Sequence, residues 1–131
     1  MSQEAHFLSV EDVLVIHDNT IGVEGGAAGL RDAGLLESAV LMPQQQFSGD
    51  YLHEGLAAMA AAYLFHISQN HAFIDGNKRT AALAALVFLE INGVGALPEP
   101  DDLEEATLAV AASEMSKDAL TDWMRAQVGG D

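Results

Sequence analysis

Apolar residues recur at spacings of three and four along most of the chain, which is the periodicity of amphipathic α-helices. Together with its capping residues, this pattern predicts an all-α fold of about six helices. The expected helices begin at Ser9, Asp32, about Tyr51, Asn77, about Asp101 and Ser116. Asp12 stands at capping-box distance from Ser9. The second, third and fourth helices are expected to end near Met42, Gln69 and Asn92.

Glycine and proline mark the connections between these helices. Four glycines predict a flexible loop after the first helix, namely Gly22, Gly25, Gly26 and Gly29. Residues 44–50 predict a second loop, and Gly93 predicts a helix stop. Residues 94–97 are expected to form a short extended piece before Pro98. The chain shows no repeat and no domain boundary, so residues 1–131 are expected to fold as a single domain.

The polar stretch 71–80, His-Ala-Phe-Ile-Asp-Gly-Asn-Lys-Arg-Thr, lies between two alanine-rich segments that predict buried helices. Polar groups held between buried helices are costly unless they find partners, so this loop is the natural place for a site. The chain has 5 Lys and Arg against 20 Asp and Glu, and two of the five cations, Lys78 and Arg79, are adjacent here. They fall where a helix begins, and a helix N-terminus favours anions. The stretch therefore predicts a phosphate-binding site.

The polar residues of this stretch suit different parts of phosphoryl transfer. His71 can accept a proton near neutral pH and is predicted to be the general base. Asp75 offers a hard oxygen ligand suited to Mg²⁺, which proteins bind through one or two carboxylates together with substrate phosphates. A glycine lets the backbone approach a ligand closely, and cations neutralise phosphates. The residues predicted to bind phosphate are Gly76, Asn77, Lys78 and Arg79.

At this spacing the residues resemble the signature of Fic-domain proteins, whose general form is His-x-Phe-x-Asp/Glu-Gly-Asn-x-Arg. Six fixed positions match. The lysine after the asparagine, Lys78, is similar to the Doc branch of the family, the death-on-curing toxins of bacterial toxin–antitoxin pairs. Residues 29–32 and 88–93 also resemble Doc segments, so the resemblance covers most of the chain.

The resemblance implies a compact Fic-type helical bundle and a transferase that uses ATP and Mg²⁺. Doc-branch toxins transfer the γ-phosphate to a threonine of elongation factor Tu, which stops translation, and this is the activity expected. AMP transfer to a protein hydroxyl, the usual Fic reaction, stays open as the alternative. Gly76 stands where Doc proteins often have alanine, and Ala72 stands where Fic proteins often have proline. Phe73 is expected to anchor the loop on the core, and Arg31 to have a substrate or structural role.

The resemblance also implies a cognate antitoxin, whose flexible segment folds into a groove on the toxin and blocks the site. Thr20, Glu24 and Gly25 match a short inhibitory motif found in some Fic proteins. Because this glutamate stands among glycines, we interpret the match as chance. His17 and His66 are interpreted as packed or helix-end histidines.

The net charge of −15 argues against general binding to DNA, RNA or anionic membranes and is compatible with a basic protein partner. The chain has no cysteine, which excludes disulfides and thiolate metal sites. Residues 1–6 lack the pattern of a signal peptide, and the apolar segments are too short or too interrupted to span a bilayer. A protein of the bacterial cytoplasm is therefore expected.

Two other classes of function stay open on the sequence alone. A Mg²⁺-dependent phosphohydrolase would need a cluster of carboxylates and histidines, of which only His71 and Asp75 are close in sequence. A non-enzymatic, acidic helical binding module would need no such loop. Replacing His71 separates both from a transferase, because only a transferase would lose the ability to label a protein.

Overall fold

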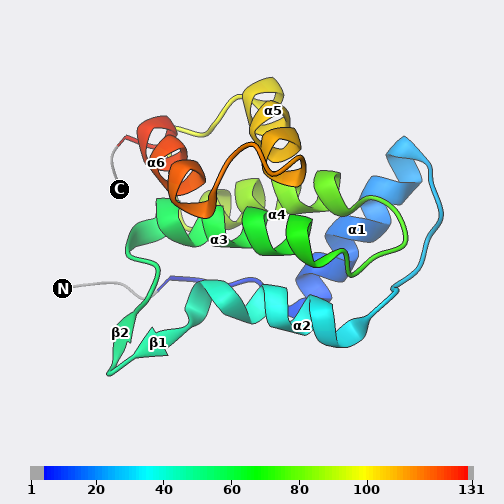
Figure 1. The fold of residues 1–131 in the computed structure, drawn as a ribbon, viewed down its shortest axis with the longest axis horizontal. Coiled ribbons are helices and arrows are strands. Elements are labelled where there is room, and N and C mark those ends of the chain that lie inside the picture. Colours follow the sequence, from blue (N-terminus) through cyan, green and yellow to red (C-terminus); the bar gives the residue numbers. More distant parts are fainter. Residues whose placement is uncertain (1–4, 130–131) are drawn as a thin grey trace.

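The computed structural model describes residues 5–129, and within this range the chain forms six α-helices, one 3₁₀ turn and one small hairpin. The helices are α1 (Val10–Glu24), α2 (Ala33–Leu41), α3 (Gly55–Asn70), α4 (Asn77–Ile91), α5 (Pro100–Ala111) and α6 (Lys117–Gln127). The turn is η1 (Met42–Gln44), and the hairpin pairs β1 (Gln46–Phe47) with antiparallel β2 (Asp50–Tyr51). The predicted all-α fold of about six helices is confirmed (Figure 1). Of residues 1–6, which lack the pattern of a signal peptide, residues 1–4 lie outside the described residues.

Local capping sets the beginnings of three helices, as the sequence predicts. Ser9 and Asp12 form a capping box, in which the Ser9 Oγ accepts from the Asp12 N–H at 3.0 Å. Asp32 and Ser116 accept a backbone N–H three residues ahead in the same way, at 3.0 and 3.1 Å. These helix starts are therefore encoded within four residues of sequence.

Three connections differ from the prediction. Helix α1 continues through Gly22 to Glu24, because its buried face still packs at Thr20 and outweighs the weak helix propensity of one glycine. Residues 44–50 contain the last residue of η1 and most of the β-hairpin rather than a plain loop, with Gly49 at φ 87° in the turn of the hairpin. Residues 94–97 form no strand. Gly93 ends α4 with φ 77°, as predicted.

The antiparallel pair α3 and α4 forms the centre of the molecule (Figure 1). Helices α5 and α6 cover one side of the pair, and α1 and α2 cover the other. Many of the buried side chains of α3 and α4 are alanines, whose small size lets helix backbones approach closely, among them Ala60, Ala61, Ala81, Ala84 and Ala85. The α3–α4 connection, residues 71–76, lies at the opposite end of the molecule from the hairpin. Each helix within residues 5–129 falls short of the length and apolarity that a membrane crossing needs.

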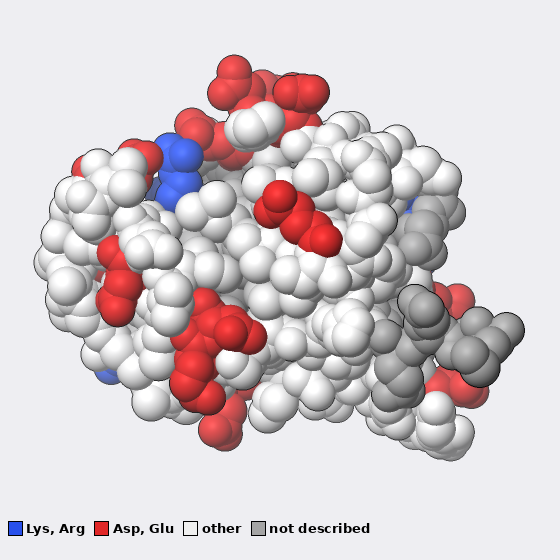
Figure 2. Space-filling view, turned by 180° about the vertical axis from the view of Figure 1, so that it is seen from behind, with Lys and Arg blue, Asp and Glu red and all other residues white. Residues whose placement is uncertain are grey.

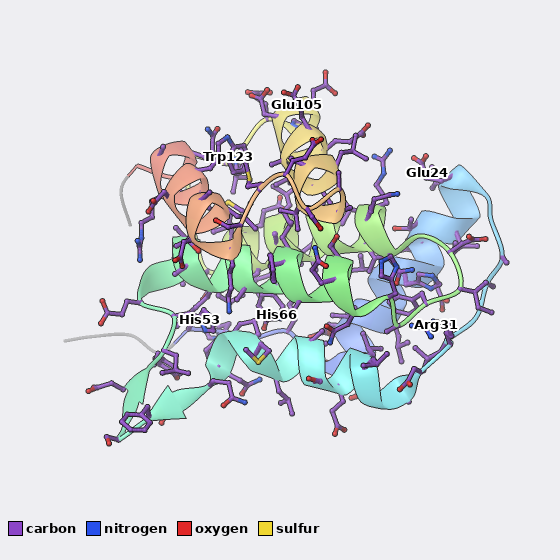
Figure 3. The ribbon with its side chains drawn as sticks, viewed as in Figure 1. Glu24, Arg31, His53, His66, Glu105 and Trp123 are labelled. Atoms are coloured by element: carbon purple, nitrogen blue, oxygen red, sulfur yellow. The ribbon has the colours of Figure 1, made fainter. Side chains whose placement is uncertain are left out.

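A polar seam joins α3 to α6. The Lys117 ammonium donates to the His66 Nε2 at 2.9 Å, and His53 lies nearby (Figure 3). Burial lowers the pKa of His66 to about 4, and the positive charges of Lys117 and His53 add to this effect. Burial also lowers the pKa of His53 and of Lys117. The fold therefore favours a neutral His66.

Replacing His66 by glutamine is expected to make the fold less sensitive to acid. As pH falls from the ordinary histidine value of 6.5 towards 4, the unfolded chain takes up a proton at His66 and the folded chain does not, so the free energy of unfolding decreases. Because the side chain is half-buried, the loss is about 1–2 kcal/mol. Glutamine accepts from Lys117 at every pH. Urea unfolding at about pH 7.5 and about pH 4.5 measures the difference, and an equal acid-induced loss in both proteins would contradict it.

Candidate active site

The loop between α3 and α4 is held in place by its own side chains. Helix α3 ends at His71 in the left-handed conformation, with φ 49° and ψ 49°. Phe73 follows and is 2% exposed, so its ring lies in the core. The Asn77 side chain closes the loop, because its Oδ1 accepts from the Phe73 N–H at 3.0 Å and its Nδ2 donates to the Phe73 carbonyl at 2.9 Å. The Asn77 amide is thus occupied by the loop, which leaves its backbone N–H for a ligand.

The segment before α2 ties the same loop from the other side. Arg31 donates from Nε to the His71 carbonyl at 2.8 Å, and its backbone N–H donates to the Ala72 carbonyl at 2.7 Å. The Ile74 N–H donates to the Gly29 carbonyl at 3.2 Å. The structure therefore gives Arg31 a structural contact with the loop, and these bonds set the direction in which His71 leaves α3.

The beginning of α4 presents free backbone donors. Gly76 precedes the helix with φ 82°, and the first helical bond runs from the Thr80 N–H to the Gly76 carbonyl at 2.9 Å. Within residues 5–129, the backbone N–H groups of Asn77, Lys78 and Arg79 donate no hydrogen bond. Three free N–H groups at the positive end of a helix dipole are suited to accept the oxygens of an anion such as phosphate as hydrogen-bond partners. A Cβ at Gly76 would lie 3.3 Å from Ile21 Cδ1, so α1 packs tightly against the beginning of α4 at this residue.

Asp75 is held at both of its polar groups. Its carboxylate Oδ2 accepts from the Ala27 N–H at 2.8 Å, and its backbone carbonyl lies 2.7 Å from His17 Nε2. Its Oδ1 accepts no hydrogen bond from the described residues, and the side chain is exposed. One free carboxylate oxygen beside a phosphate site fits Mg²⁺, which keeps water and substrate phosphates as its other ligands. Within residues 5–129 no group of three or more His, Cys, Asp or Glu side chains could hold a metal alone, so the phosphates would have to complete the coordination.

A pocket of about 400 Å³ runs from this loop along the groove between α4 and α5. Its polar end is formed by the exposed side chains of His71, Asp75, Lys78 and Arg79. Its other end is apolar and is lined mainly by Ala82, Leu83, Leu86, Leu103 and Leu108. The structure therefore brings the predicted base, the predicted metal ligand and the predicted phosphate-binding residues to one opening.

Arg79 is paired with two carboxylates at the mouth of this pocket. Its Nη2 lies 3.2 Å from Glu104 on α5 and 3.6 Å from Glu24 on α1. Glu24 and Arg31 lie on the side of the molecule that carries the loop (Figure 3). We interpreted the motif match at Glu24 as chance because this glutamate stands among glycines, but Glu24 is the last residue of α1, which brings it to Arg79. All three side chains are about half exposed, so each pair is weak and phosphate can compete with it.

Comparisons with known proteins identify the family of the chain. Residues 7–89 match the model of the Fic/DOC family. The chain belongs to the Fic/Doc family. It is 33% identical over 122 residues to "Protein kinase doc" of Escherichia phage P1, which covers 93% of this chain and 95% of the relative. It is 40% identical over 116 residues to "Toxin Doc" of Mycolicibacterium smegmatis, covering 87% of each.

Three residues of this Fic/Doc site could not be assigned from the sequence. Glu24 and Glu104 reach Arg79 from helices on either side of α4, and His17 lies 2% exposed beneath the loop. The His17 ring stacks on the Phe73 ring, with centroids 3.7 Å apart and planes 7° from parallel. The interpretation of His17 as a packed histidine is correct about its burial but omits its contact with Asp75.

Proposed function

We propose that this Fic/Doc protein is the toxin of a toxin–antitoxin pair and a protein kinase. It transfers the γ-phosphate of ATP, with Mg²⁺, to a threonine of elongation factor Tu in the bacterial cytoplasm and thereby arrests translation. The observation that carries the proposal is the convergence of His71, Asp75 and the free N-terminus of α4 on one pocket. The names of the two relatives, a protein kinase and a toxin, support it.

The proposed chemistry assigns one task to each group. His71 takes the proton from the acceptor hydroxyl, whose oxygen then attacks the γ-phosphorus while the bond to the β-phosphate oxygen breaks and ADP leaves. The N–H groups at the start of α4, with Lys78 and Arg79, hold the phosphate oxygens. Asp75 would hold Mg²⁺, which supplies charge neutralisation between the β- and γ-phosphates when bound. Positioning and charge neutralisation account for most catalysis of this kind, so this small set of residues suffices.

Lys78 favours γ-phosphate transfer over AMP transfer. It is the second residue of α4 and its side chain is exposed at the pocket, with no carboxylate in salt-bridge range among the described residues. Where a glycine would leave room for the α-phosphate against this turn, the lysine fills the space. Its charge also prefers the more anionic end of the triphosphate.

One assay with two labels tests the proposal. Wild-type protein is incubated with elongation factor Tu and ATP labelled at either the α- or the γ-phosphate, and we expect only the γ-label to enter the acceptor. Lys78→Gly should lose this transfer, and mass spectrometry of the acceptor distinguishes a phosphate from an AMP group. An AMP adduct without phosphate from the wild-type protein would replace the kinase assignment with the Fic-type alternative.

The apolar end of the pocket suits the proposed antitoxin. The groove between α4 and α5 exposes Leu108 to solvent, leaves Leu83 and Leu86 half-buried, and carries Glu104 at its edge. Acidic side chains are spread over the molecular face in Figure 2, in keeping with the net charge of −15. A basic amphipathic segment that folds in this groove would bury its apolar side on the leucines and cover the polar end of the pocket.

A further inference from the structure

His17 lies beneath the phosphate loop, although it belongs to α1 and is 58 residues distant from Asp75 in sequence. Its side chain is 2% exposed, and its Nε2 lies 2.7 Å from the Asp75 carbonyl oxygen. A carbonyl oxygen can only accept a hydrogen bond, so Nε2 must carry a hydrogen and donate it. The ring also stacks on Phe73, which fixes its plane. The direction of this N–H is therefore set by the core.

We propose that His17 is a positioning residue that holds Asp75 in the orientation needed to bind Mg²⁺. The inference rests on the proposed role of Asp75 as the metal ligand. Asp75 is fixed at two points, because His17 holds its backbone carbonyl and the Ala27 N–H holds its Oδ2. With both points fixed, rotation of the carboxylate is restricted, and Asp75 lines the pocket with an Oδ1 that accepts no hydrogen bond from the described residues. Loss of the His17 bond frees the peptide between Asp75 and Gly76 to rotate.

His17 also supports the start of α4. A Cβ at Gly76 would lie 3.5 Å from both Cδ2 and Nε2 of His17, so the ring packs directly against this left-handed residue. Gly76 determines where the free N–H groups of α4 begin. One buried ring therefore orients the metal carboxylate and the anion-binding helix start together, and a change at His17 should affect Mg²⁺-dependent binding of ATP.

Two substitutions separate the hydrogen bond from the packing. His17→Phe retains the stack on Phe73 and removes the donor. His17→Gln places an amide N–H close to the position of Nε2 and removes the stack. We expect His17→Phe to weaken Mg·ATP binding by about tenfold, the scale of one hydrogen bond, and His17→Gln to restore most of this affinity. Titration calorimetry with ATP, with and without Mg²⁺, measures the metal-dependent part. His66→Gln, outside the site, is the matched control and should bind Mg·ATP as the wild type does.

Two readouts need no transferase activity. Amide hydrogen exchange should increase at residues 74–76 in His17→Phe and return towards the wild-type rate in His17→Gln. In the wild-type protein, nitrogen NMR of the imidazole should show hydrogen on Nε2, a result that stands even if a variant folds poorly. An Nε2 without hydrogen would overturn the proposal. Equal Mg·ATP affinity and loop exchange in His17→Phe and wild type would do the same. If the wild type labels no acceptor protein, only the proposed transfer fails, because these measurements involve no acceptor.

Discussion

Replacing His71 by asparagine is expected to lower the transfer of phosphate to protein by about a hundred- to ten-thousand-fold, the usual contribution of a general base. The His71 side chain is exposed at the pocket and makes no hydrogen bond with the described residues, so the fold does not depend on it. Its backbone is left-handed, with φ 49°, and asparagine tolerates this conformation better than alanine. His71→Asn therefore removes the base with little strain. His71→Ala adds a backbone cost of about 1 kcal/mol.

Single-turnover transfer of labelled γ-phosphate measures this loss, and thermal unfolding measures the fold. We expect the thermal midpoint of His71→Asn to match that of the wild type and its affinity for Mg·ATP to change little, since the phosphate donors belong to α4. If His71→Asn transfers phosphate at the wild-type rate, another group takes the proton and His71 has no part in the chemistry.

The parts of the fold that depend on local sequence were predictable. Ser9, Asp32 and Ser116 cap their helices through bonds that span three residues. The candidate phosphate loop was also visible in the sequence, because its groups all come from residues 71–79 at fixed spacing, and its phosphate-binding role stays a prediction. Local spacing is sufficient wherever the interacting groups are near one another in the chain.

Contacts between distant segments were not predictable from one sequence. Glu104 reaches Arg79 because α5 packs beside α4, and His17 reaches Asp75 because α1 packs beneath the loop. The extension of α1 through Gly22 has the same origin, since tertiary packing overrides the low helix propensity of glycine. The inhibitory-motif match at Glu24 was visible, but its contact with Arg79 depends on that extension. Glu104 and His17 carry no local signal that distinguishes them from surface or core residues.

We expect the negative charge of Asp75 to be essential for Mg²⁺ binding. We expect the hydrogen bonds of its side chain to maintain the conformation of the loop. Asp75→Asn keeps an oxygen that can accept from the Ala27 N–H, and its backbone carbonyl can still accept from His17. The neutral amide is a poor ligand for Mg²⁺, so the loop should persist while the metal-dependent part of ATP binding is lost. Charge stabilisation by a metal is worth several kcal/mol, so kcat/KM should fall by more than about a hundredfold.

Calorimetry with ATP in Mg²⁺ and in EDTA separates the effect of Asp75 on Mg²⁺-dependent ATP binding from its effect on ATP binding without the metal. In EDTA, Asp75→Asn should bind ATP at least as well as the wild type, because a negative charge beside the phosphates has been removed. Mg²⁺ should make the wild type bind ATP more tightly than it does in EDTA. It should not increase the affinity of Asp75→Asn for ATP. Asp75→Ala also loses the hydrogen bond from the Ala27 N–H. Faster amide exchange at residues 26–28 in Asp75→Ala but not in Asp75→Asn would therefore measure the contribution of this bond to the structure of the loop. Unchanged Mg·ATP affinity in Asp75→Asn would show that the metal is held by the phosphates alone.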